Sequence, residues 1–163
     1  MSQEVQRPPY GAALLVTGVV FALYAITLAP TTAFWDTSEY IATGYILGIP
    51  HPPGNPLFVS IARVWSLLLA PTGLSVAVRI NLLAAFTSAL STGFLFLISH
   101  RVLSVLVSRP AAAKIGAAAA SLIGATAYTV WSQSTVNEKV YTLSVLVIAY
   151  SAKTTPVTIS AAP

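Results

Sequence analysis

The chain holds four acidic residues, and two of them, Asp36 and Glu39, stand three positions apart. A carboxylate can act as a general base that takes a proton from an attacking hydroxyl, and partial burial raises its basicity. The same spacing is also typical of a helix start, where Asp36 would cap the helix and Glu39 would complete a capping box. Both interpretations stay open, because a capped helix is also a rigid mount for a catalytic group.

A histidine in a proline-rich segment follows the two carboxylates. His51 is flanked by four prolines, Pro50, Pro52, Pro53 and Pro56. Because the residue before a proline is pushed out of the helical region, the sequence predicts an extended, stiff loop over 51–56. In that loop His51 is either a solvated side chain or a hydrogen-bond donor to a phosphate group.

Three further side chains are candidates for substrate binding. Trp35, directly before Asp36, fits either an aromatic belt at a membrane interface or a surface on which a sugar stacks. Arg79 either anchors a helix at that interface or neutralises a phosphate leaving group. Glu138 forms, in the simplest interpretation, an exposed ion pair with Lys139.

Several chemistries are excluded by what the sequence lacks. The chain has no cysteine, which rules out disulfides, thiolate metal sites and cysteine nucleophiles. It has no glycine-rich phosphate loop, no Ser/His/Asp set and no metal-ligand spacing, so we expect neither a metal nor another cofactor. The net charge of +4 comes from basic residues scattered at segment ends, so we expect no nucleic-acid partner.

The composition indicates that a lipid bilayer surrounds the elements that position these residues. Hydrophobic residues make up 56% of the chain and charged residues 7%, with a mean hydropathy of +0.80. Soluble domains carry roughly 25% charged residues. Three stretches without a charged side chain, 8–35, 80–100 and 115–137, each reach the roughly 20 residues that a helix needs to cross the hydrocarbon core.

We therefore expect an all-α, polytopic transmembrane protein. Residues 1–150 would form one transmembrane domain, and 151–163 a disordered or truncated tail. The predicted spans are 11–30, 80–99, 115–130 and a partial fourth at 140–150. Interfacial helices are expected at 37–48, in the first external loop, and at 57–70.

Charge and residue size also predict orientation and packing. The segment 100–114 is basic and free of acids, which places it in the cytoplasm together with the N-terminus. Residues 31–77, with the two carboxylates, would then be external. Gly116, Ala120 and Gly124 are four apart and predict that the third span packs closely through small residues.

Four segments carry a resemblance to a known family. They are 27–43 (TLAPTTAFWDTSEYIAT), 51–58 (HPPGNPLF), 78–82 (VRINL) and 131–143 (WSQSTVNEKVYTL). In this order they resemble a membrane family, formerly known only as a domain of unknown function, that is grouped with GT-C glycosyltransferases and includes protein O-mannosyltransferases. The resemblance covers about residues 10–148 and stops at the tail. Members of that family have more spans, so the chain resembles an N-terminal fragment.

The resemblance implies inverting transfer of a sugar, with mannose as the first candidate, from a polyprenyl-phosphate donor to a protein hydroxyl or another acceptor. Asp36 matches the catalytic position of the first external loop best, and Glu39 is the second candidate. His51 and Glu138 fall in motif positions that would shape the donor pocket. We expect a multi-pass protein of the bacterial cytoplasmic membrane, with the active loop on its external side.

Two other functions stay open on the sequence. The first is a non-catalytic membrane scaffold or partner subunit that uses small-residue helix faces. The second is a fragment of a transporter with Asp36 or Glu138 as the coupling carboxylate. Transporters place such groups within their spans near the midplane of the bilayer, whereas these two lie in predicted loops, which counts against the second alternative.

Overall fold

The computed structural model describes residues 8–33, 35–137 and 140–155. All regular secondary structure in these ranges is helical, which confirms the expected all-α class. The elements are α1 (Tyr10–Ile26), α2 (Thr37–Ile46), α3 (Pro56–Leu68), a short 3-10 helix η1 (Ala70–Thr72), α4 (Val76–Leu106), α5 (Pro110–Thr126), α6 (Tyr128–Thr135) and α7 (Tyr141–Thr154).

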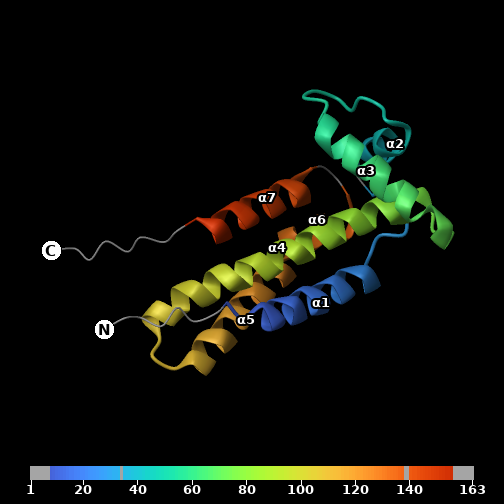
Figure 1. The fold of residues 1–163 in the computed structure, drawn as a ribbon. Coiled ribbons are helices and arrows are strands. Elements are labelled where there is room, and N and C mark those ends of the chain that lie inside the picture. The colour runs from blue at the N-terminus through green and yellow to red at the C-terminus, as the bar shows by residue number, and fades with distance from the viewer. Residues whose placement is uncertain (1–7, 34, 138–139, 156–163) are drawn as a thin grey trace.

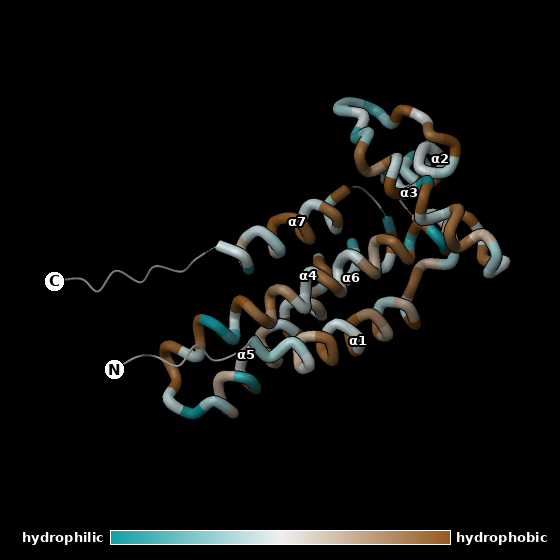
Figure 2. The backbone as a smooth tube through the Cα atoms, viewed as in Figure 1, coloured by the Kyte–Doolittle hydropathy of each residue, from teal (hydrophilic) through white to brown (hydrophobic). Residues whose placement is uncertain are grey.

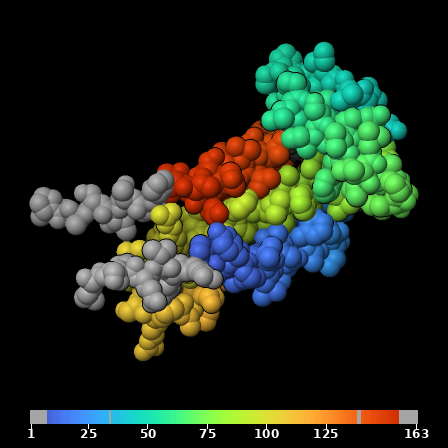
Figure 3. Space-filling model, in the orientation of Figure 1, coloured from blue at the N-terminus to red at the C-terminus, as the bar shows by residue number. Residues whose placement is uncertain are grey.

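Helix α4 is the centre of the fold. Helices α1, α5 and α7 run beside it and pack against it, while α2 and α3 lie at one of its ends (Figure 1). The space-filling view shows α2 and α3 as a separate mass over that end, next to α7 (Figure 3). The candidate residues of the first loop therefore sit at one end of a helical bundle.

The long helix α4 is capped at its N-terminus by Ser75, whose hydroxyl accepts a hydrogen bond from the backbone N–H of Val78 at 3.3 Å. It runs for 31 residues, which is about 45 Å at 1.5 Å per residue. Among the described residues it is the one unbroken helix that is long and apolar enough to cross a bilayer. It extends beyond the predicted span 80–99 at both ends, because Arg79 and Arg101 lie within the helix and do not end it.

The other expected spans are shorter or interrupted. Helix α1 has 17 residues, and α5 is separated from α6 by a 66° bend, so 115–130 is not the continuous helix that the sequence predicted. The break falls at Ala127, whose ψ of 134° is extended. The Tyr24 hydroxyl donates to the Ala125 carbonyl at 2.9 Å and so stabilises this break. Counting α5 and α6 as one broken span gives two candidate spans in the described part of the chain, and a multi-span arrangement stays a prediction.

Two boundaries also differ from the sequence-based expectation. The basic segment 100–114 is mostly helical, and residues 107–109 alone join α4 to α5. Pro110 starts α5, where its missing N–H removes no helical hydrogen bond. At the other end of the chain α7 continues to Thr154, so part of the tail expected to be disordered is helical. Residues 156–163 lie outside the described ranges.

Apolar side chains cover the outer faces of α1 and α7. Figure 2 shows apolar residues along the bundle helices and hydrophilic residues gathered near their ends. The exposed apolar side chains include Leu14, Leu15, Val19, Ile26, Val147 and Ile148. Large contiguous apolar patches are rare on soluble proteins, so this surface is suited to lipid or to further protein.

Helix α5 packs through a different row of small residues from the predicted one. Its buried residues are Ala113, Ala117, Ser121 and Ala125. Ala120 and Gly124 are exposed, and a Cβ added at Gly124 would meet nothing within 4 Å. The prediction is therefore wrong: the buried row of α5 is shifted by one residue from the predicted row of Gly116, Ala120 and Gly124.

Two bundle helices, α1 and α4, approach each other closely at Gly93 of α4. A Cβ added there would come within 2.2 Å of Thr17 Oγ1 and 3.5 Å of the Ala13 carbonyl, both on α1. We expect Gly93→Leu to destabilise the protein by about 1–3 kcal/mol, because α1 and α4 must move apart. Thermal unfolding in detergent measures this effect. Gly124→Leu is the matched control and should leave stability unchanged; equal losses for the two variants would contradict the packing described.

Candidate functional site

The first loop and the two short helices around it form a platform at the end of α4. Tyr40 of α2 packs with Phe58, Val59 and Ala62 of α3 and with Leu83 of α4 in one buried cluster. The approach of α2 to α3 is close, since a Cβ at position 44 would lie 2.9 Å from the Ala62 Cβ. The platform is therefore fixed by packing and not by the loop alone.

The loop that joins α2 to α3 is a compact turn. Helix α2 is terminated by its C-cap residue Leu47, which adopts the left-handed conformation (φ 57°). The Gly54 N–H then donates to the His51 carbonyl at 3.0 Å, so 51–56 is turned and not extended as predicted. Asn55 Nδ2 donates to the buried Tyr40 hydroxyl at 2.7 Å and ties the end of the loop to α2.

This turn brings Asp36, Glu39 and His51 together. Glu39 holds His51 by two contacts: the His51 backbone N–H donates to Oε1 at 2.7 Å, and the ring Nδ1 lies 2.6 Å from Oε2. On the other side of the ring, Nε2 lies 3.9 Å from Asp36 Oδ2. The three side chains are 32–44% exposed, so the cluster is open to solvent.

The prediction of a capping box at the start of α2 is wrong. Asp36 does occupy the N-cap position of α2, but its side chain makes no capping hydrogen bond. The Glu39 carboxylate contacts His51, twelve positions ahead in the chain, with both of its oxygens. Since both carboxylates face the loop, the helix start presents them to the site.

The contact with His51 changes the acidity of Glu39. Hydrogen bonds from the His51 ring and from its backbone N–H lower the pKa of Glu39 below its ordinary value. Because the folded-state pKa is depressed, this contact contributes stability at pH values above the ordinary pKa. That contribution is lost as the pH falls through the folded-state value. Glu39 is therefore ionised at neutral pH.

The same three residues are the group that could hold a cation. One ligand atom from each of Asp36, Glu39 and His51 can be chosen so that all lie within 4.8 Å of one another. The spacing along the sequence predicted no metal, because the ligands meet only through the turn. Glu39 Oε2 and His51 Nδ1 contact each other directly, so a cation would have to use the remaining atoms or displace this contact.

Two of the other predicted site residues, Trp35 and Arg79, lie in different surroundings. Trp35, beside Asp36, is 83% exposed and has a left-handed backbone (φ 65°). Arg79 donates from Nη1 to the Ser66 carbonyl at 2.8 Å, and its own carbonyl accepts from Trp65 Nε1, so it joins α4 to α3. Glu138 lies outside the described residues.

A buried asparagine that the sequence interpretation did not identify as a site residue anchors the segment before Asp36. Asn81 of α4 donates from Nδ2 to the carbonyls of Ala29 (2.9 Å) and Thr31 (3.2 Å). Its Oδ1 accepts from the backbone N–H of Asn137 at 2.9 Å. Asn81 thus joins three segments, and the signal for it was an amide at the start of an otherwise apolar stretch.

The described residues thus form an all-helical domain with an apolar central helix. A carboxylate–imidazole cluster lies at one end of the bundle. The chain belongs to the family of the protein O-mannosyl-transferase TMEM260 N-terminal domain, whose model matches residues 36–154. The match begins at Asp36 and includes the whole cluster, and it confirms the resemblance found in the sequence.

Two curated relatives carry the same description. The chain is 39% identical over 77 residues to the protein O-mannosyl-transferase TMEM260 of Mus musculus, covering 47% of this chain and 11% of that protein. It is 29% identical over 75 residues to the protein O-mannosyl-transferase tmem260 of Dictyostelium discoideum, covering 46% of this chain and 9% of that protein. The matched stretch thus spans about a tenth of the length of these relatives. No solved structure matches it.

Proposed function

We propose that the chain is the site-bearing N-terminal part of a membrane glycosyltransferase. This enzyme would transfer mannose from a polyprenyl-phosphate donor to a hydroxyl group of a protein. Membership of the family and the names of the two relatives support the class of reaction. The observation that carries the proposal is the Asp36–His51–Glu39 cluster, which places a half-exposed carboxylate at one end of an apolar bundle.

The proposed reaction assigns Asp36 as the general base. Asp36 takes the proton of the acceptor hydroxyl while the hydroxyl oxygen forms a bond to the anomeric carbon of the sugar. The bond from that carbon to the phosphate oxygen breaks on the opposite face, and polyprenyl phosphate leaves with the electron pair. The exposed indole of Trp35 is adjacent and offers a surface on which the sugar stacks. Arg79 is engaged with Ser66, so we assign it to the support of the platform.

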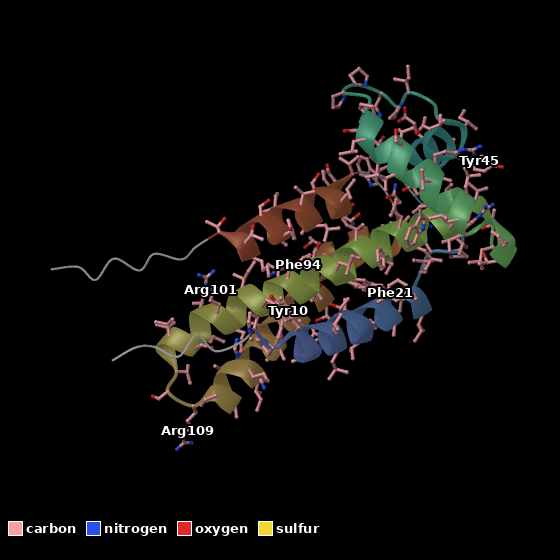
Figure 4. All side chains as sticks on the ribbon, viewed as in Figure 1. Tyr10, Phe21, Tyr45, Phe94, Arg101 and Arg109 are labelled. Atoms are coloured by element: carbon pink, nitrogen blue, oxygen red, sulfur yellow. The ribbon has the colours of Figure 1, made fainter. Side chains whose placement is uncertain are left out.

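The distribution of charge supports an external site in a multi-pass protein. Figure 4 shows Arg101 and Arg109 towards one end of the bundle and Tyr45, on α2, at the other. Because basic residues favour the cytoplasmic side, we infer that the cluster is external, where a lipid-linked donor in the outer leaflet would be within reach. The bacterial cytoplasmic membrane expected from the sequence stays a prediction.

A transfer assay with the full-length protein tests the proposal. The purified protein in detergent is given radiolabelled mannose as polyprenyl-phosphate mannose or as GDP-mannose, with an unfolded serine- and threonine-rich protein as acceptor. We expect label in the acceptor with the lipid donor only. Transfer from GDP-mannose alone would show that the donor is a nucleotide sugar and not a polyprenyl-phosphate sugar. An absence of transfer from both donors would favour the non-catalytic scaffold.

A further inference from the structure

The ring of His51 is held so that one nitrogen is fixed and the other faces the proposed base. Glu39 contacts both the backbone N–H and Nδ1 of His51, at 2.7 and 2.6 Å. The Tyr40 ring lies edge-on to the imidazole with centroids 6.0 Å apart and limits its rotation. The remaining ring nitrogen, Nε2, lies 3.9 Å from Asp36 Oδ2.

The carboxylate of Glu39 also selects the tautomer of the ring. A carboxylate accepts hydrogen bonds and donates none, so the proton of the neutral ring resides on Nδ1. Nε2 then has a free lone pair directed to the side where Asp36 lies. This order, carboxylate to imidazole to reacting group, is the one by which a buried or half-buried carboxylate orients a histidine and stabilises its protonated form.

We propose that His51 and Glu39 form a proton relay behind Asp36, in which His51 Nε2 receives the proton that Asp36 takes from the acceptor hydroxyl. Glu39 is a positioning residue, since it acts through the ring of His51. This inference rests on the proposed function and reassigns Glu39, which the sequence offered as an alternative base, and His51, which it offered as a donor to phosphate.

The relay has a complete proton balance. The acceptor O–H bond breaks and its proton binds to Asp36. It then passes to Nε2, directly or through one water, because the 3.9 Å separation is longer than a hydrogen bond. The imidazolium is stabilised by the Glu39 carboxylate, and the ring, 44% exposed, releases the proton to water. Asp36 is thereby returned to its ionised form for the next turnover.

The charged groups near the ring are accounted for within the described residues. Asp36 and Glu39 come from the start of α2, and Tyr40 contributes its ring face. The basic residue of α3, Arg63, donates to the Tyr45 carbonyl and lies over the Tyr45 ring at 5.1 Å. Arg63 is therefore engaged with Tyr45, and Asp36 is the carboxylate on the Nε2 side of the ring.

Two variants of His51 separate the relay from a structural role. In His51→Asn the amide nitrogen takes the place of Nδ1 and keeps the hydrogen bond to Glu39, but no group remains at Nε2. We expect kcat for mannose transfer by the full-length protein to fall roughly 10- to 100-fold with KM unchanged, less than the loss of the base itself. His51→Ala should fall at least as far, and added imidazole should restore a large part of its activity.

The Glu39→Gln variant tests the positioning role. Glutamine keeps an acceptor for the His51 backbone N–H but lacks the negative charge that faces the ring, so kcat should fall about tenfold with KM unchanged. Added imidazole should rescue His51→Ala less well when Glu39→Gln is also present. Ser38→Ala, a change at an exposed residue between the two carboxylates, is the matched control with parental kinetics.

The outcomes distinguish the relay from the proposed function. An inactive Asp36→Asn protein together with His51→Asn and His51→Ala at parental kcat would overturn the relay and leave the function standing. So would a His51 variant with raised KM, unchanged kcat and no rescue by imidazole, because that result describes a donor-binding residue. An active Asp36→Asn protein would overturn the assignment of the base itself. Circular dichroism and size-exclusion elution of each variant establish that it is folded.

Discussion

Asp36→Asn in the full-length protein should abolish measurable mannose transfer, with a fall in kcat of about 10²- to 10⁴-fold. The amide has nearly the size of the carboxylate but cannot accept the proton of the attacking hydroxyl. The change leaves the start of α2 intact, because the Asp36 side chain makes no capping hydrogen bond there. Single-turnover transfer of labelled mannose measures the loss at the chemical step.

The matched comparison for that variant is Glu39→Gln. Both changes remove one negative charge from the same cluster, but Glu39 contacts His51 and does not face an acceptor in the proposed reaction. We expect a loss of about tenfold for Glu39→Gln, well below that for a missing general base. A near-parental Asp36→Asn enzyme with an inactive Glu39→Gln enzyme would move the base to Glu39. Two active variants would show that the loop has only a structural role.

The second large effect is expected at Asn81. Asn81→Ala removes the two hydrogen bonds to the carbonyls of Ala29 and Thr31 and leaves the Asn137 N–H without its acceptor. Asn81 is fully buried, and a buried polar group without a partner costs about 1–3 kcal/mol. We therefore expect a lower midpoint of thermal unfolding in detergent. Transfer should also weaken, because Thr31 begins the segment that leads to Asp36.

Two controls define what the Asn81 result means. Asn81→Asp keeps an oxygen for the Asn137 N–H and loses both donated bonds, so its midpoint should lie below the parent. Thr87→Ala removes a buried hydroxyl whose hydrogen bonds go only to carbonyls of its own helix, Leu83 and Ala84. It should therefore cost much less than Asn81→Ala. Equal midpoints for Thr87→Ala and Asn81→Ala would show that the link between the three segments contributes nothing.

The helical class and the position of the two carboxylates at a helix start were predictable from local patterns. Uncharged stretches predicted the bundle helices, and the spacing of Asp36 and Glu39 predicted a helix start that carries two carboxylates. The partner of Glu39 was not predictable in this way. It lies twelve residues away and is brought back by the left-handed Leu47 and by the turn that begins at His51. The spacing of residues along the sequence gives no signal for such long-range contacts.

The packing face of α5 illustrates a second limit. Most of this helix is alanine and glycine, so the sequence offers little contrast in size or polarity from one residue to the next. Gly116 and Gly124 suggested one row, whereas Ala117 and Ala125, one position later, are the buried residues. Neighbouring helices determine which row is buried, and the Tyr24 hydroxyl of α1 likewise contacts the carbonyl of Ala125 next to the bend.

The links from the end of α1 to α5 and α6 have a consequence for the order in which the protein is made. Tyr24 and Ala125 are 101 residues apart, and Trp131 Nε1 donates to Thr27 Oγ1 across 104 residues. At about 5–20 residues per second, a ribosome needs about 5–20 s to make such an interval. During that time the segment leading to Asp36 has emerged without its anchors. The nascent polypeptide therefore carries the candidate carboxylates well before the segment that leads to them is anchored, and the link from Asn81 to Asn137 forms only after Asn137 has been made.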